Sequence, residues 1–283
     1  MRTALPSDLP VCALDHLPPL REVIAQHGLR AEKALGQNFL LDQNITDKIV
    51  RQAGDLRGKT VIEIGPGPGG LTRSLLRSNA KKVIALEFDM RAVAALSGLV
   101  EAAQGWLQVV HADALDTDLT TLCAGRRVIV ANLPYNIATP LLMRWLAQIR
   151  RDPGVYDAMI LMFQKEVAQR IVAPVGEKAY GRLSVMSQWL CDVRKCFDLP
   201  PSAFTPPPKV KSSVVRFVPK ALGADAPEFT TVEAVTAAAF GQRRKMIRSS
   251  LSDYADAIDA LGLEPTVRAE TLSPVDFIQL AKY

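Results

Sequence analysis

The hydrophobic positions of this chain fall into short runs rich in valine and isoleucine, which alternate with longer mixed segments. After residue 58 the runs read TVIEIG, KVIALE, LQVVHA, RVIVAN and YDAMILMF. Segments between them, such as GGLTRSLLRSN and DMRAVAALSGLVEAA, have the length of helices. Short apolar strands alternating with helices are typical of βαβ units, in which helices cover both faces of a parallel sheet. The pattern therefore predicts an α/β fold with a mostly parallel sheet.

The flanks of these runs predict the remaining elements and the domain boundaries. PLREVIAQHGL and QNITDKIVRQAG read as helices before the sheet, and LSVMSQWLCDVRKCFDL and SSVVRFVP are expected to form its last strands, for seven in all. The stretch LPPSAFTPPPKVKSS holds five prolines and is predicted to lack regular structure. KALGADAPE, after Pro219, is predicted to be a linker. We expect an N-terminal extension and first helix over 1–29, a main domain over 30–220 and a small C-terminal all-helical domain over 221–283.

The composition of the 283 residues narrows the class of protein. Hydrophobic residues make up 48% and charged residues 22%, which is usual for a globular chain. No apolar run reaches the length of a membrane span, and the proline-rich N-terminus lacks the apolar core of a signal peptide, so we expect a cytoplasmic protein. The four cysteines form no Cys-x-x-Cys pair and the histidines do not cluster near them, so no metal site is expected.

The net charge of +5 is unevenly distributed along the chain. Residues 150–222 carry 12 Lys and Arg against 6 Asp and Glu, and the cluster GQRRKMIRSS stands out within an acidic tail. Such basic islands fit a polyanionic partner that contacts selected surfaces. Charge alone fits an ordinary solvated face equally well.

A glycine-rich loop follows the first predicted strand of the sheet and precedes a helix. Gly65, Gly67 and Gly70 satisfy the pattern G-x-G-x-x-G, and Glu87 ends the next strand about twenty residues later. This is the fingerprint of a nucleotide site in which the acid binds ribose hydroxyls, although a tight turn without a ligand is the alternative. NAD needs backbone N–H groups for its pyrophosphate, and prolines between the glycines remove two of them. S-adenosylmethionine has no phosphate, so it is the favoured cofactor.

Four successive strands end in residues that could bind such a cofactor. They are Gly65, Glu87, Asp113 and Asn132, and all fall on the carboxyl edge at which open α/β sheets bind ligands. Asp113 lies where the sheet would meet the adenine amino group. Either acid alone could equally cap a helix or lie on the surface. The four in register predict a Rossmann-like class I methyltransferase domain.

The fourth strand ends in Asn132-Leu133-Pro134-Tyr135, an unusual way to leave a buried strand. The Asn132 side-chain oxygen and the Leu133 carbonyl could accept both N–H bonds of an exocyclic adenine amine and so free its delocalised lone pair. Pro134 fixes its own φ and favours an extended Leu133, and Tyr135 could stack on the base. No strong base is required, because the methylated nitrogen becomes acidic. The alternative is that Asn132 caps the next helix and Pro-Tyr forms a turn.

Ordered blocks of the sequence resemble one known family. The blocks are GQNFL, EIGPGPGGLT, ALEFD, ADAL, NLPYNIATPLL and SAFTPPPKVKSSVV, between about Arg30 and Arg216, and FGQRRKMIRSSL in the tail. They are similar to the ribosomal RNA small subunit adenine N6,N6-dimethyltransferase family, KsgA in bacteria. The resemblance implies dimethylation of two adjacent adenines near the 3′ end of 16S rRNA, on a nearly assembled 30S subunit, with a role in subunit biogenesis. Nothing in the sequence requires a dimer, so we expect a monomer.

The resemblance also implies roles for single residues. Asn38 and Leu40 would be N-terminal contacts of the cofactor, and Asn132 would meet both the cofactor and the target amine. Phe204 would stack on the target base opposite the tyrosine of Asn-Leu-Pro-Tyr, although a core phenylalanine that anchors its loop is an alternative. The adenine must leave its own stack to reach the pocket, at a cost of roughly a few kcal/mol that two stacking rings would offset.

Basic residues beside these motifs are candidate phosphate contacts. They are Lys209 and Lys211 near Phe204 and, in the tail, Arg243, Arg244, Lys245 and Arg248. For any one of them a solvated side chain is the alternative.

Four other functions fit part of the pattern. A large-subunit rRNA adenine methyltransferase of the antibiotic-resistance type shares most blocks, but GPGPGGLT and the long tail favour the small-subunit family. DNA adenine-N6 methyltransferases usually show Asp-Pro-Pro-Tyr and a target-recognition insert, which this sequence lacks. The intact set of strand-end residues disfavours an assembly factor with a vestigial pocket, and the prolines of the glycine loop disfavour an NAD dehydrogenase.

Overall fold

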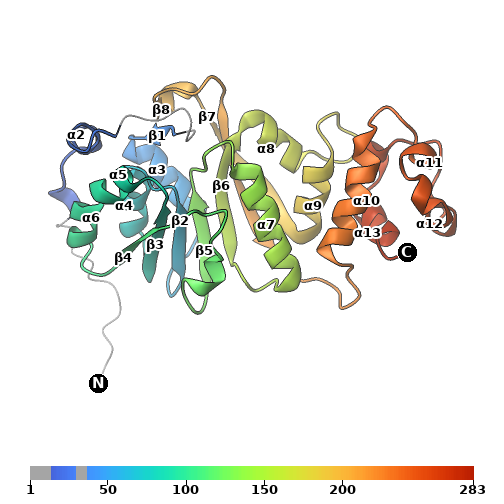
Figure 1. Ribbon diagram of the computed structural model, residues 1–283, viewed down its shortest axis with the longest axis horizontal. Helices are drawn as coiled ribbons and strands as arrows, with labels where there is room; N and C mark the ends of the chain where they lie inside the picture. The colour runs from blue at the N-terminus through green and yellow to red at the C-terminus, as the bar shows by residue number, and fades with distance from the viewer. Residues whose placement is uncertain (1–13, 30–36) are drawn as a thin grey trace. The chain divides into compact units, whose positions relative to one another are not determined.

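A seven-stranded sheet organises the fold (Figure 1). The computed structural model describes residues 14–29 and 37–283. The strand order is β4-β3-β2-β5-β6-β9-β7, and the neighbouring pairs from β4 to β6 are parallel. The strands are β2 (Thr60–Ile64), β3 (Lys82–Glu87), β4 (Leu107–His111), β5 (Arg127–Ala131), β6 (Ala158–Gln164), β7 (Cys191–Leu199) and β9 (Ser212–Pro219). The predicted α/β architecture with a mostly parallel sheet is confirmed.

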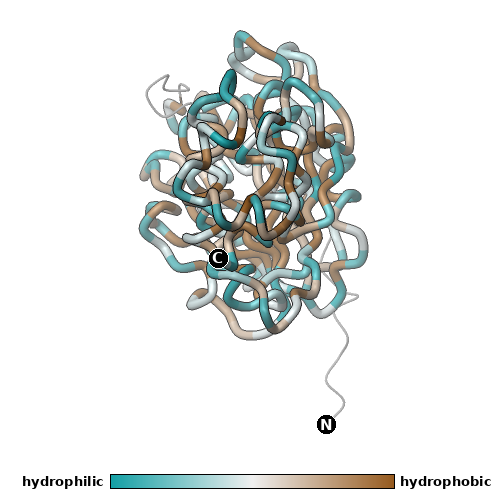
Figure 2. The backbone as a smooth tube through the Cα atoms, turned by 90° about the vertical axis from the view of Figure 1, so that its right-hand side faces the viewer, coloured by the Kyte–Doolittle hydropathy of each residue, from teal (hydrophilic) through white to brown (hydrophobic). Residues whose placement is uncertain are grey.

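Helices cover the sheet, and all five residues of β2 are therefore buried. The helices up to β7 are α2 (Leu20–Gln26), α3 (Gln43–Arg51), α4 (Gly70–Leu76), α5 (Met90–Ala95), α6 (Ser97–Ala102), α7 (Ala138–Arg151), α8 (Lys165–Val172) and α9 (Arg182–Leu190). Those of the tail are α10 (Phe229–Gly241), α11 (Ile247–Ser250), α12 (Ala255–Ala260) and α13 (Pro274–Leu280). Along the helical coils in Figure 2 the colour changes repeatedly between hydrophilic and hydrophobic, as expected for helices with one buried face. None of the helices in the described ranges is long and apolar enough to cross a membrane.

The chain divides into two compact units. The sheet unit comprises the described residues up to Leu142, together with Val155–Lys165 and Cys196–Arg216. The helical unit comprises Met143–Gly154, Glu166–Lys195 and Phe217–Tyr283. In the helical unit α10 packs on α9 and α13, and the Phe240 ring lies 6.0 Å from the Tyr180 ring and 5.4 Å from the Phe277 ring. The helical tail is thus part of a larger helical unit, and the domain boundary at residue 220 remains a prediction from the sequence.

One predicted strand is wrong in its first half. LSVMSQWL forms helix α9, and the chain enters strand β7 only at Cys191. Six of the nine residues of α9 are buried, from Ser184 to Leu190. A helix buried on most sides has no clear 3.6-residue alternation, so the hydrophobic pattern cannot distinguish it from a buried strand.

The proline-rich segment contains a short strand that the sequence did not predict. Phe204–Thr205 (β8) pairs antiparallel with Phe39–Leu40 (β1), with Leu40 opposite Phe204. The prolines flank this pair and leave its N–H groups free to bond. The segment that contains Asn38 and Leu40 is thereby tied to the Phe204 loop.

The predicted helices around the glycine loop are present, with one difference. The segment DMRAVAALSGLVEAA forms two helices, α5 and α6, that meet at Leu96. The first predicted helix is α2, and the remainder of the N-terminal extension, residues 1–13, lies outside the described residues.

Candidate active site

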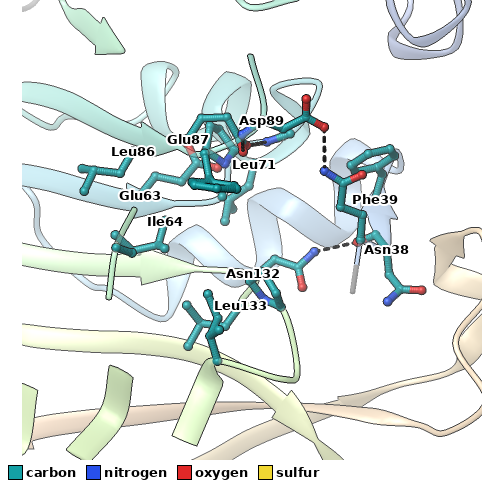
Figure 3. Close-up of a pocket in the computed structure, with 18 of the residues that line it drawn as sticks. Asn38, Phe39, Glu63, Ile64, Leu71, Leu86, Glu87, Asp89, Asn132 and Leu133 are labelled. Atoms are coloured by element: carbon teal, nitrogen blue, oxygen red, sulfur yellow. Dashed lines mark hydrogen bonds between the residues drawn. The ribbon is translucent and has the colours of Figure 1, made fainter. Parts of the chain in front are cut away.

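A pocket of about 230 Å³ opens where the parallel strands end. It is lined by residues 37–40, 63–68, 70–71, 86–89, 112–115 and 132–137. These segments lie at or after the ends of β2, β3, β4 and β5 and include the stretch before α3. Figure 3 shows labelled residues from all of them except the segment after β4. The structure thus brings Gly65, Glu87, Asp113 and Asn132 into the wall of one pocket.

The glycine loop is shaped by the segment 37–40 that packs against it. Gly67 has a φ of +55°, and a Cβ there would lie 2.9 Å from the Phe39 ring. A Cβ on Gly70 would lie 2.2 Å from the Leu40 carbonyl oxygen. Any side chain at these two positions would therefore push the segment away. Asn38 and Leu40 line the pocket as a result.

Glu87 holds the glycine loop from the end of β3. One carboxylate oxygen accepts the Gly67 N–H at 3.0 Å and the other accepts the Asp89 N–H at 2.8 Å. The side chain is 6% exposed, and this burial raises the pKa of the Glu87 carboxyl. Because the Gly67 N–H already donates to Glu87 and two neighbouring loop residues are prolines, the loop offers few donors to a phosphate.

Two further acids lie in the same wall. Asp89 accepts hydrogen bonds from the Arg91 guanidinium and from Gln37 Nε2, and the Arg91 bonds are the main reason that its pKa falls to about 2. Gln37 is thereby tied to the loop after β3. Asp113 accepts the Leu115 N–H at 2.8 Å, so it caps its own turn as well as lining the pocket.

Asn132 is oriented by the segment before α3. Its Nδ2 donates to the Asn38 carbonyl oxygen at 2.9 Å (Figure 3). A carbonyl oxygen only accepts, so the NH₂ group must be the end of the amide that faces it, and Oδ1 takes the other position. The Pro134 carbonyl accepts the N–H groups of Ile137 and Ala138 at the start of α7. These two hydrogen bonds therefore do not engage the Leu133 carbonyl.

Tyr135 is half-buried at the pocket wall, with its hydroxyl 2.6 Å from the Ser212 hydroxyl. Burial raises the pKa of the Tyr135 phenol. The ring is therefore held at its far end, and the hydroxyl remains protonated at neutral pH.

Phe204 does not line this pocket. Its side chain is 3% exposed and belongs to the core cluster that also contains Leu40, its partner across the β1–β8 pair. The ring is thus packed into the core in this structure, and its stacking on a target base stays a prediction. The alternative interpretation from the sequence, a phenylalanine that anchors its loop, describes what the structure shows.

The predicted phosphate contacts differ in their surroundings. Lys209, Lys211, Arg244, Lys245 and Arg248 are exposed. Arg243 is exposed as well, but its Nη2 donates to the backbone carbonyls of Lys178 and Tyr180, at 2.7 and 3.1 Å. Arg243 thus anchors a loop within the helical unit, and it is a poorer candidate for a phosphate contact than its neighbours.

Glu63 and Phe88 line the pocket although the sequence did not single them out. Phe88 is 59% exposed and directly follows Glu87, a position at which an exposed aromatic residue is a signal for a ligand. Glu63 is 1% exposed, and its Oε2 has no hydrogen-bond partner within the described part of the chain. Burial, with a smaller contribution from the nearby Glu87 carboxylate, raises the pKa of Glu63 to about 8. Glu63 is therefore largely protonated at neutral pH.

Replacing Glu63 by glutamine should make the stability less sensitive to pH. Between about pH 4.5 and 8 the folded protein keeps the Glu63 proton that the unfolded chain has released, so the free energy of unfolding falls as pH rises. Each unit of pKa difference corresponds to about 1.4 kcal/mol. The free energy of unfolding of Glu63→Gln, relative to that of the parent protein, should rise by a few kcal/mol between these two pH values. Above about pH 8 this difference should stay constant. Urea unfolding without cofactor at a series of pH values measures the difference, and a difference that is constant with pH would contradict the assignment.

The pocket fits S-adenosylmethionine better than a dinucleotide. It offers a carboxylate for a ribose diol, an exposed aromatic ring beside that carboxylate, and a buried carboxyl group with one unpartnered oxygen. Its glycine loop has few free donors for a phosphate. Across the described residues, no group of three or more His, Cys, Asp and Glu side chains could hold a metal ion.

Comparison with known proteins places the chain among enzymes that modify ribosomal RNA. A family model described as ribosomal RNA adenine dimethylase matches residues 28–283. The chain is 53% identical over 271 residues to Ribosomal RNA small subunit methyltransferase A of Rhodospirillum rubrum, with 95% of this chain and 93% of the relative covered. It is 55% identical over 277 residues to the protein of the same name from Rhodopseudomonas palustris (strain BisB5), with 95% of each chain covered.

Solved structures agree with this placement. The crystal structure of a dimethyladenosine transferase from Plasmodium falciparum is similar with a TM-score of 0.72 and 28% identity, over 84% of this chain and 94% of that one. The 23S rRNA methyltransferase ErmE has a TM-score of 0.67 at 24% identity, over 87% and 98% of the two chains, which supports the fold alone. The predicted Rossmann-like methyltransferase fold is confirmed.

Proposed function

This chain belongs to the ribosomal RNA adenine dimethylase family, and we propose that it dimethylates the N6 amines of two adjacent adenines near the 3′ end of 16S rRNA, on a nearly assembled small subunit. Family membership makes it an S-adenosylmethionine-dependent rRNA adenine dimethyltransferase. One observation carries the mechanism. The Asn132 amide is fixed in the pocket wall, with its oxygen on the side away from the Asn38 carbonyl.

The cofactor would be held by residues from four strand ends and from the segment 37–40. The Glu87 carboxylate would accept the ribose hydroxyls, since each oxygen now accepts one N–H and a carboxylate oxygen has room for a second donor. Phe88 would cover the adenine ring, and Asp113 would accept from its amino group. Gly65 and Asn38 would line the methionine part. When bound, S-adenosylmethionine supplies a methyl group on a positively charged sulfur.

The target amine would be activated by two acceptors. Asn132 Oδ1 and the Leu133 carbonyl would each accept one N–H of the adenine amine and so direct its lone pair toward the methyl group. Most of the rate gain would come from this positioning, because no strong base is needed. The released proton would pass to water once the nitrogen is methylated. Tyr135 would stack on the flipped base, which contributes roughly 1–3 kcal/mol.

The choice of RNA rests on the relatives and on exposed cations. The relatives named above carry small-subunit RNA in their name, and the chain is more than half identical to them. The likeness to ErmE does not decide between the ribosomal subunits, because it supports the fold alone. Lys209 and Lys211 in the sheet unit, and Arg244, Lys245 and Arg248 in the helical unit, are exposed and would contact phosphates.

A labelled cofactor tests the substrate directly. We expect labelled S-adenosylmethionine to transfer its methyl group to small subunits that lack the two dimethyladenosines, and not to methylated small subunits, large subunits or duplex DNA. Digestion of the labelled RNA should give N6,N6-dimethyladenosine from two adjacent positions. Label found only in large-subunit RNA or in DNA would refute the proposal.

A further inference from the structure

The Tyr135 ring is anchored by a residue that no step described above uses. Tyr135 follows β5, whereas Ser212 is the first residue of β9, and β6 lies between these strands in the sheet. The hydroxyl–hydroxyl contact of 2.6 Å therefore reaches across the end of β6, over a span of about 10 Å between strands. The contact thus connects the Tyr135 loop, which would hold the target base, with a strand two places away in the same sheet unit.

Ser212 is a rigid anchor for this contact. Its side chain is fully buried, and the preceding residue is tied to the start of α8, directly after β6, by a backbone hydrogen bond from the Lys165 N–H to the Lys211 carbonyl, at 2.8 Å. A buried serine on a paired strand has little freedom to follow a moving ring. The contact thus fixes the far end of the Tyr135 side chain, while the backbone of Asn132–Tyr135 fixes its near end.

We propose that Ser212 is a positioning residue which, by holding the Tyr135 ring in place, supports chiefly the second of the two methyl transfers to each adenine. This inference rests on the function proposed above. In the first transfer the amine has two N–H bonds, so two acceptors and the ring orient the base. In the second transfer only one N–H remains, and the base is oriented by one acceptor and the ring. Loosening the ring should therefore slow the second transfer more than the first.

The adjacent serine provides a matched control. Ser213 is also fully buried on β9, but its hydroxyl donates to Asp198 at 2.8 Å and not to Tyr135. Because side chains alternate along a strand, the two serines have different partners on opposite sides. Ser213→Ala therefore shows the effect of losing a buried serine hydroxyl on this strand, and Ser212→Ala shows the effect of losing the contact with Tyr135 as well.

Single-turnover methylation of undermethylated small subunits tests the proposal with Ser212→Ala, Tyr135→Phe, the double variant and Ser213→Ala. Time courses of N6-methyladenosine and N6,N6-dimethyladenosine give the two rate constants separately. We expect Ser212→Ala to lower the second rate constant about tenfold and the first about twofold, less than the roughly hundredfold cost of a displaced reacting group. Tyr135→Phe should give a similar loss, and the double variant should lose no more than either single one. Ser213→Ala should keep the parental ratio of the two constants.

Each alternative result has a defined meaning. A variant with part of its molecules misfolded lowers both rate constants by the same factor, so an unchanged ratio in Ser212→Ala would overturn the positioning role. Losses that multiply in the double variant would show that the two hydroxyls act independently, which also overturns it. If the parent protein does not methylate small subunits at all, the proposed function fails before this comparison is reached.

Discussion

Asn132→Ala should abolish methyl transfer while cofactor binding largely survives. The variant lacks the amide oxygen that would accept a target N–H, and it lacks the bond from Nδ2 to the Asn38 carbonyl that orients this amide. Removing one preorganised hydrogen-bonding group from an active site typically costs 10²–10³-fold in rate, and here the geometry of the pocket is disturbed as well. We expect a loss of about a thousandfold or more in the single-turnover rate on undermethylated small subunits.

Two measurements separate this effect from a damaged pocket. Calorimetric titration with S-adenosylhomocysteine should give a dissociation constant within a few fold of the parent value, because Glu87 and the glycine loop are intact. Asn132→Gln keeps the amide but moves its oxygen by one methylene, and it should remain nearly as slow, since a displacement of about 1 Å already costs about a hundredfold. Transfer at the parental rate in Asn132→Ala would rule out the acceptor mechanism.

The strand-end residues could be predicted because they follow from a periodic pattern. Apolar runs fix where each parallel strand ends, and parallel strands all present their carboxyl ends at one edge. Glu87, Asp113 and Asn132 therefore had to meet, and they do line one pocket. The roles assigned to them on the bound cofactor and RNA remain predictions.

The residues that were missed, and those whose surroundings the sequence did not show, depend on long-range contacts. Phe204 is buried because its segment pairs with Phe39–Leu40, a partner far away in the sequence. Arg243 donates hydrogen bonds to two backbone carbonyls of a loop that is distant in the sequence. Neither contact leaves a periodic signal. Glu63 reads as one more position of a buried strand, and only the fold shows that it lines a pocket and that one of its carboxyl oxygens has no hydrogen-bond partner among the described residues.

Glu87→Ala should weaken cofactor binding directly. The carboxylate would accept two ribose hydroxyls, and a hydrogen bond to a charged group is worth about 1.5–3 kcal/mol. Losing both should raise the dissociation constant for S-adenosylhomocysteine at least about a hundredfold. The variant also loses the bonds to the Gly67 and Asp89 N–H groups, so a change in the glycine loop could produce the same loss without any ribose contact.

A cofactor analogue distinguishes these two causes. The 2′,3′-dideoxy form of S-adenosylhomocysteine lacks the hydroxyls that Glu87 would accept, so the parent protein should bind it much more weakly than the natural compound. If Glu87 contacts the ribose, Glu87→Ala should bind the two compounds almost equally, because the group that tells them apart is gone. If Glu87 only shapes the loop, the variant should weaken both compounds by the same factor and keep the parental preference for the natural one. Unchanged affinity for S-adenosylhomocysteine in Glu87→Ala would remove Glu87 from the site altogether, and with it the reason to place the ribose at the end of β3.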